Sequence, residues 1–147
     1  MTKILEDGSF VPFRVELDES SGPISPRFQY TITIAIWTEG GAVHVVREER
    51  VGSPRRKVHA EGVLSREAAE TLARALEEHD ALSRAADHVG DALDDKGHSC
   101  NRMVLTVKEQ RAEMHYLLRT LERKDRRAEA AIVQAVKDAA ATIPSSA

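Results

Sequence analysis

The clearest pattern in the chain is a regular alternation of apolar and other residues over positions 28–37. Successive side chains of a strand point to opposite faces, so this stretch predicts a strand with one apolar face. That face consists of Phe28, Tyr30, Ile32, Ile34 and Ile36. Gly40-Gly41 predicts a tight turn, and residues 42–51 predict the returning strand of a hairpin.

Shorter alternating stretches on either side of this hairpin predict two more strands. Residues 10–17 alternate apolar and polar side chains but contain Pro12, which has no amide hydrogen to donate to a neighbouring strand. We therefore expect this strand at an edge of the sheet. Residues 18–26 contain two prolines and a glycine and predict a loop. Residues 57–64 predict a short strand with its apolar side chains on one face.

Residues 102–118 allow two interpretations. The first half alternates apolar and polar residues up to Val107, and the second half does so up to Leu118. This pattern predicts a second hairpin that turns near Glu109-Gln110, although no glycine or asparagine marks the turn. The alternative is one long helix starting near Val107, because the residue types that follow favour a helix. We favour the hairpin because residues 102–107 are strongly strand-like and need a strand to pair with.

Two stretches have the apolar spacing of helices that pack along one side. Residues 65–82 begin with Ser65, a favourable N-cap, and residues 125–142 end before Pro144. Residues 82–93 keep helical spacing but contain a glycine, and predict a short helix or a packed loop. Strands with one apolar face and helices with one apolar stripe bury each other in layers. The expected fold is therefore α+β: an antiparallel sheet of about five to six strands with two main helices packed on one face.

Length, charge and cysteine content restrict the class of protein. The chain has 147 residues, a formal net charge of -3 and one cysteine. This length suits a single domain, 1–147, with its core at about 10–143 and a frayed tail at 144–147. A lone cysteine cannot form an internal disulfide, and no apolar run approaches membrane-spanning length. Because no signal-peptide pattern opens the chain, we expect a cytoplasmic location and no membrane contact.

The best candidate for catalysis is the polar segment 94–100. It places His98 and Cys100 close to two aspartates, and a nucleophilic thiol needs such a base beside it. No family cysteine signature and no oxyanion turn surrounds the pair, so the segment predicts a polar connection leading into a strand. The histidines are not spaced along the sequence as metal ligands would be, and the sequence contains no phosphate-binding motif. We therefore expect no catalytic residues, no metal and no cofactor.

A cluster of basic residues lies between positions 119 and 127. Arg126 and Arg127 fall at the start of the last predicted helix, where the helix dipole disfavours positive charge. Together with Arg123 they are candidates for contacting an acidic partner. The simpler interpretation is a solvated surface neutralised by nearby acids. Nucleic-acid binding is disfavoured by the slightly negative charge of the chain.

Trp37 is the other candidate for a contact. It shares the outer face of the first hairpin with Thr31 and Thr33, and tryptophan is enriched where proteins bind one another. The alternative is that Trp37 covers its own hairpin or the strand at 10–17.

On balance the sequence favours a non-enzymatic protein-binding module, such as a regulator, an inhibitor or an immunity-type protein. Its partner would be another protein, bound through the outer sheet face or the charged surface, and a homodimer through that face or an edge strand is a further expectation. The alternative is a small cysteine-dependent enzyme that uses Cys100 and His98. A third hypothesis is nucleic-acid binding through the Arg119–Arg127 cluster.

Overall fold

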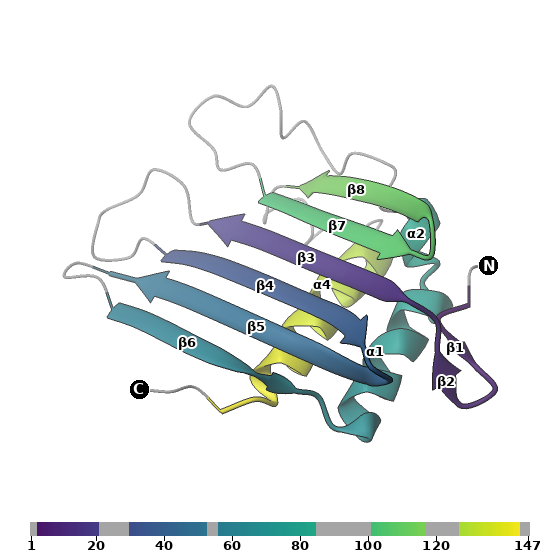
Figure 1. Cartoon of the computed structure of the whole chain (residues 1–147). Coiled ribbons are helices and arrows are strands. Elements are labelled where there is room, and N and C mark those ends of the chain that lie inside the picture. Colours follow the sequence, from purple (N-terminus) through teal and green to yellow (C-terminus); the bar gives the residue numbers. More distant parts are fainter. Residues whose placement is uncertain (1–2, 21–29, 53–55, 85–100, 117–126, 145–147) are drawn as a thin grey trace.

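The computed structural model of the chain describes residues 3–20, 30–52, 56–84, 101–116 and 127–144. A six-stranded antiparallel sheet forms one layer and the helices form the other (Figure 1). The strands of this sheet are β3 (Phe13–Ser20), β4 (Tyr30–Glu39), β5 (Ala42–Val51), β6 (Arg56–Val63), β7 (Asn101–Val107) and β8 (Gln110–Tyr116). The helices are α1 (Arg66–Glu78), the single turn α2 (Ala81–Arg84) and α4 (Arg127–Ala141). A separate two-stranded hairpin consists of β1 (Leu5–Glu6) and β2 (Ser9–Phe10).

The strands lie in the order β6-β5-β4-β3-β7-β8. The expected α+β fold, with its two main helices on one face of an antiparallel sheet, is confirmed. The expected edge position of the first strand is wrong, because β3 lies between β4 and β7. Pro12 comes just before β3, so its missing amide hydrogen costs no bond within the sheet. Its carbonyl oxygen instead accepts a hydrogen bond from the Lys108 amide at 2.9 Å.

Both predicted hairpins are present. The first pairs β4 with β5 across Gly40-Gly41, whose φ angles of 60° and 81° lie where only glycine is unstrained. The second pairs β7 with β8, so the alternative of one long helix from Val107 is wrong. Lys108 takes the left-handed conformation at this turn, with φ of 57°, a position at which glycine would be favoured. Residues 18–20 of the loop expected at 18–26 belong to β3, which continues to Ser20, and the rest of that loop lies outside the described residues.

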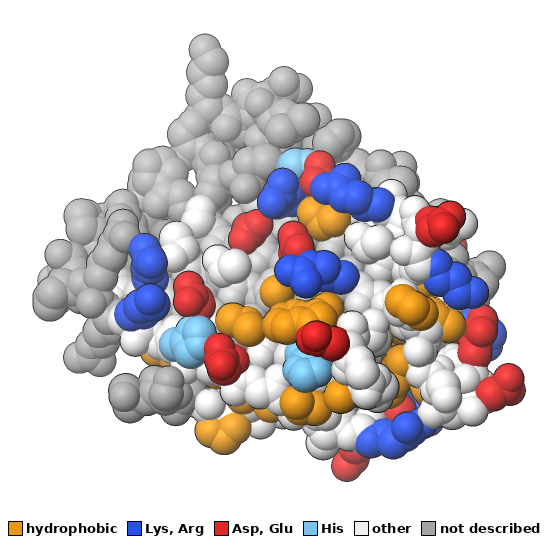
Figure 2. All heavy atoms as spheres, viewed as in Figure 1, with side chains coloured by type: hydrophobic (Ala, Val, Ile, Leu, Met, Phe, Trp, Pro, Cys, Tyr) orange, Lys and Arg blue, Asp and Glu red, His pale blue; other side chains and the backbone are white. Residues whose placement is uncertain are grey.

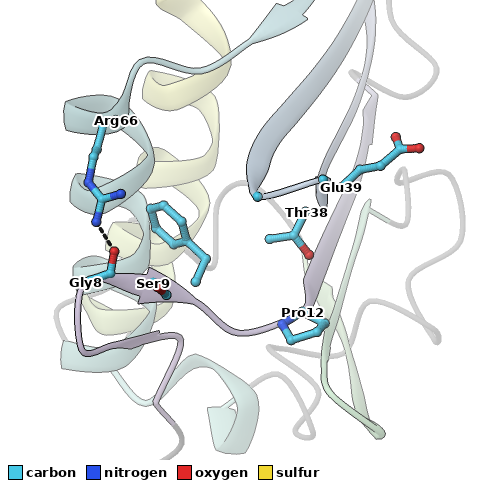
Figure 3. Close-up of a pocket in the computed structure, with 9 residues that line it drawn as sticks. Gly8, Ser9, Pro12, Thr38, Glu39 and Arg66 are labelled. Atoms are coloured by element: carbon cyan, nitrogen blue, oxygen red, sulfur yellow. Dashed lines mark hydrogen bonds between the residues drawn. The ribbon is translucent and has the colours of Figure 1, made fainter.

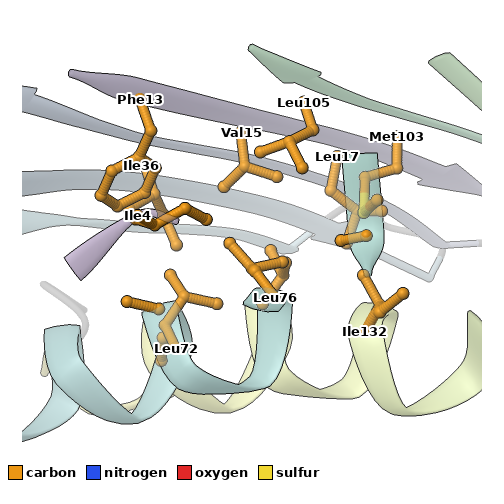
Figure 4. Packing of buried hydrophobic residues seen from close by; sticks show 14 of the residues in the cluster. Ile4, Phe13, Val15, Leu17, Ile36, Leu72, Leu76, Met103, Leu105 and Ile132 are labelled. Atoms are coloured by element: carbon orange, nitrogen blue, oxygen red, sulfur yellow. The ribbon is translucent and has the colours of Figure 1, made fainter. Parts of the chain in front are cut away.

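The core lies between the inner face of the sheet and the helices α1 and α4 (Figure 4). Ile34 and Ile36 of the predicted apolar face are buried, while Tyr30 and Ile32 nearer the strand end are half-buried. Fully buried partners from other elements are Val15, Leu17, Leu72, Leu76, Leu105 and Ile132. Ile4, which precedes the first strand expected from the sequence, also belongs to this core.

The start of α1 follows its sequence signal. The Ser65 hydroxyl oxygen accepts the Ala68 amide at 3.1 Å, which satisfies one of the free amides of the first turn. The helix ends at Glu78, earlier than expected, and the chain then forms the short α2. Glu77 fastens the N-terminal hairpin to α1, because its Oε1 accepts the Ile4 amide at 2.9 Å.

Candidate functional site

The outer face of the sheet is an open surface that all six strands of the large sheet share. The helices all lie behind the sheet, so they leave this face uncovered (Figure 1). Figure 2 shows the same face in space-filling form: hydrophobic side chains gather over the middle of the sheet, and charged and histidine side chains surround them. An exposed apolar patch with a polar rim is typical of a protein contact surface.

Two adjacent rows of side chains cross all six strands on this face. The two rows lie two sequence positions apart on each strand. Neighbouring residues within a row lie directly opposite each other on paired strands. The first, which we call the cationic row, holds no acid and consists of Val63, His44, Trp37, Arg14, Thr106 and Arg111. The second, which we call the acidic row, holds no base and consists of Glu61, Val46, Ala35, Glu16, Val104 and Glu113.

Trp37 is held firmly within the cationic row. Its ring stacks on His44 with centroids 5.7 Å apart and an interplanar angle of 17°. The Arg14 guanidinium lies 5.4 Å from the centre of the Trp37 ring, a favourable cation–π distance. The indole Nε1 donates to Glu39 at 3.3 Å. Trp37 therefore covers its own hairpin and the neighbouring strand, and it still keeps part of its ring accessible.

Ion pairs join the two rows along the strands. Arg14 Nε lies 2.5 Å from Glu16 Oε1, and Arg111 Nη2 lies 3.1 Å from Glu113 Oε1. A hydrogen bond from His115, aided by the charge of Arg111, holds the pKa of the Glu113 carboxyl below its ordinary value. These pairs are exposed, so they contribute little to stability and remain available to a partner.

Beside Trp37 the outer face has a shallow hollow of about 300 Å³. His44, Val46, Glu61 and Val63 from the two rows contribute to its lining. Val63 is 51% exposed, which is unusual for a large apolar side chain and places an apolar contact at the rim of the hollow.

A second hollow, of about 320 Å³, is lined by residues of the two turns at Gly8 and Gly40-Gly41 (Figure 3). Arg66 projects into it but already donates to the Gly8 carbonyl and to Glu70. Thr38 Oγ1 accepts the Phe13 amide at 3.1 Å. These polar groups already form hydrogen bonds within the chain. We therefore interpret the hollow as the place where the N-terminal hairpin, α1 and β4 meet.

A third hollow of about 560 Å³ runs between α1 and α4. Small side chains such as Ala68 and Ala135 line it, and its polar pair Gln134–Asp138 is joined by a hydrogen bond of 2.8 Å. Glu67 and Asp138 contribute the charged side chains of its lining.

The structure brings together only part of the predicted site. Trp37, Thr31 and Thr33 share the outer face of β4, and both threonines are exposed. Arg127 is exposed at the first residue of α4, on the side of the sheet where the helices pack. Four further candidates, His98, Cys100, Arg123 and Arg126, lie outside the described residues.

Sequence reasoning missed Arg14 and His44 as neighbours of Trp37. The alternation does place Arg14 on the polar side of its strand. Its position beside Trp37 follows from the register Arg14↔Trp37, which requires β3 to pair with β4. The sequence did indicate the strand at 10–17 as one that Trp37 could cover, but it gave no register that would place Arg14 beside the ring.

A buried polar network lies on the opposite, inner side of the sheet. Glu19, near the end of β3, is 3% exposed, although it was expected in a loop. Its Oε1 accepts the Tyr116 hydroxyl at 3.0 Å, and its Oε2 accepts Lys137 Nζ at 2.7 Å. The network joins β3, β8 and α4 and satisfies a carboxylate that would otherwise be costly to bury.

This network makes the fold sensitive to alkaline pH. Burial, reinforced by the nearby Glu19 charge, raises the pKa of the Tyr116 phenol, and burial also raises the pKa of Tyr30. The folded state therefore favours the protonated phenol. Its stabilising contribution is fully present below about pH 10, the ordinary tyrosine value, and is lost as the pH rises above it.

An ultraviolet titration tests this expectation on the two tyrosines of the chain. Tyr116 should ionise only together with alkaline unfolding and Tyr30 above its ordinary value, whereas in urea both phenols should titrate near pH 10. Tyr116→Phe should make the loss of stability above pH 10 shallower, because phenylalanine has no proton to lose. Full ionisation of both phenols near pH 10 with the fold intact would contradict the raised pKa of Tyr116.

Comparisons with known proteins do not assign the chain to a family. Within the described ranges, no three His, Cys, Asp or Glu side chains come together as metal ligands would. No helix in the described part of the chain is both long and apolar enough to cross a membrane. No protein-family model, curated protein or solved structure matches the chain.

Proposed function

We propose that this chain is a non-enzymatic protein-binding module that acts through the outer face of its sheet. The observation that carries the proposal is the exposed centre of that face, where Trp37 lies between Arg14 and His44. Tryptophan and arginine dominate the binding energy of many protein interfaces. The contacts within the row also fix the Trp37 ring before a partner arrives, which lowers the entropy lost on binding.

The surrounding residues support the same conclusion. Val46 and Ala35 extend the apolar part of the face, and the Arg14–Glu16 ion pair lies next to them on the central strand β3. Aromatic and arginine side chains are both enriched in protein interfaces. A regulator, an inhibitor or an immunity-type protein would need no more than such a surface. We place the protein in the cytoplasm, in keeping with its single cysteine.

Capture experiments with extracts of the native host test the proposal. The wild-type chain and an Arg74→Ala control, altered at an exposed site on α1, should retain the same proteins. Trp37→Ala should lose them, with affinity reduced at least about thirtyfold, as expected for a tryptophan at the centre of an interface. Circular dichroism should show that all three chains are folded. An unchanged set of captured proteins with Trp37→Ala would refute the proposal.

A further inference from the structure

The charge pattern of the outer face points to a specific occupant. We propose that this face binds a second copy of the chain, face to face, around a two-fold axis that runs between the cationic row and the acidic row. The inference rests on the proposed function, because it names the partner of the same face.

The first argument is charge complementarity. A two-fold axis parallel to the rows and midway between them places each row over the other row of the second copy. Arg14 then lies opposite the partner's Glu16, and Arg111 lies opposite the partner's Glu113. Every such contact occurs twice, because a two-fold interface uses the same surface on both copies.

The existing ion pairs strengthen this arrangement. Arg14 and Glu16 are already adjacent within one chain, at 2.5 Å. Two copies therefore bring together four charges of alternating sign, and each charge has opposite charges as its neighbours. A two-fold axis along the strands, midway between β3 and β4, would instead place Glu61 over the partner's Glu113 and leave Arg14 and Glu16 with no opposite charge across the interface. The charges thus favour one direction of the axis, because like charges in an interface are strongly unfavourable.

The second argument is size complementarity. The same axis places the large Trp37 side chain opposite the partner's Ala35, and Ala35 opposite the partner's Trp37. His44 lies opposite the partner's Val46 in the same way. Face-to-face sheets pack about 10 Å apart with strand directions within about 30° of each other, so residues close to the axis keep these partners. Large side chains opposite small ones fill such a layer without voids.

The third argument is area. With the axis midway between the rows, the six strands of the two copies overlap over about five residues each, or roughly 500 Å² per copy at a strand spacing of about 4.8 Å and about 3.4 Å per residue. The total of roughly 1,000 Å² reaches the lower limit of a specific interface.

The test uses two charge reversals on exposed side chains of β3. Arg14 and Glu16 have side-chain exposures of 49% and 39%, so Arg14→Glu and Glu16→Arg should leave the fold intact. Either variant alone creates two like-charge contacts in the dimer and should raise the dissociation constant at least about a hundredfold. In an equimolar mixture of the two variants, each carries the charge that the other needs, and a heterodimer should form. Arg74→Glu on α1, also beside a glutamate, is the matched control and should remain dimeric.

Molar mass measured by analytical ultracentrifugation over a concentration series separates the outcomes. A dimeric wild type, two monomeric variants and their heterodimer support the proposal. A monomeric wild type at all concentrations, or dimers unaffected by both reversals, would overturn it. If the wild type is monomeric but captures another protein only when Trp37 is present, the partner is wrong while the proposed function stands. If capture also ignores Trp37, both fail.

Discussion

Replacing Lys137 with methionine is expected to destabilise the fold by about 3–5 kcal/mol at neutral pH. The Glu19 side chain is only 1% exposed, and Lys137 Nζ at 2.7 Å is the positive charge that neutralises it. Methionine has a similar shape but no charge, so among the described residues the buried carboxylate would keep the Tyr116 hydroxyl as its hydrogen-bond partner and lose its counter-charge. A single domain is commonly stable by about 5–15 kcal/mol, so the loss is large. Urea unfolding followed by circular dichroism measures it.

Two further variants separate the buried charge from the lost methylene contacts. Glu19→Gln combined with Lys137→Met removes both charges and should recover most of the stability, because a neutral amide is far cheaper to bury. Lys57→Met, at an exposed position of β6, should change the free energy of unfolding by less than about 0.5 kcal/mol. If Lys137→Met costs less than about 1 kcal/mol, Glu19 is not a buried unpaired charge in the variant, because water reaches it or it takes up a proton.

Ile36→Ala is expected to cost about 2–5 kcal/mol, through the loss of apolar burial and the cavity that remains. Ile36 is fully buried on β4 and lies in the layer between the sheet and α1 (Figure 4). Its strand pairs with β3 on one side and β5 on the other, so the backbone has little freedom to close the gap. The cost should therefore lie in the upper part of that range, measured as a lower urea midpoint with an unchanged slope.

Val51→Ala is the control for this substitution. Val51 ends β5 and is 43% exposed, so its truncation should cost less than about 0.5 kcal/mol. Similar losses for the two variants would show that β4 does not carry the core of the domain.

Much of the fold could be predicted because it depends on local patterns. The alternation that ends in Ile34 and Ile36 identified the inner face of the first hairpin, and Ser65 identified the start of α1. Trp37 could be placed on the outer face for the same reason. These features depend on neighbouring residues in the sequence, whose geometry is fixed by the period of a strand or a helix.

What could not be predicted depends on pairing between distant segments. The central position of β3 results from its pairing with β7. Pro12 wrongly suggested an edge strand, because it lies one residue before β3 and so removes no hydrogen bond from the sheet. The two rows on the outer face exist only in this register. Glu19 was assigned to a loop because an acidic residue gives no local sign of burial. Only the positions of Tyr116 and Lys137 in the fold explain its place.

The strand order also has a consequence for how the chain folds. Every neighbouring pair in the six-stranded sheet is adjacent along the described chain except β3 and β7, whose residues Asp18 and Arg102 pair across 84 positions. Strands β3 to β6 can form a meander early, whereas docking of β7 must close a long loop at a large entropic cost. We expect this docking to limit the folding rate, since distant contacts slow the folding of small domains. Until it occurs, β3 is an open sheet edge, and the nascent chain is most exposed to aggregation there.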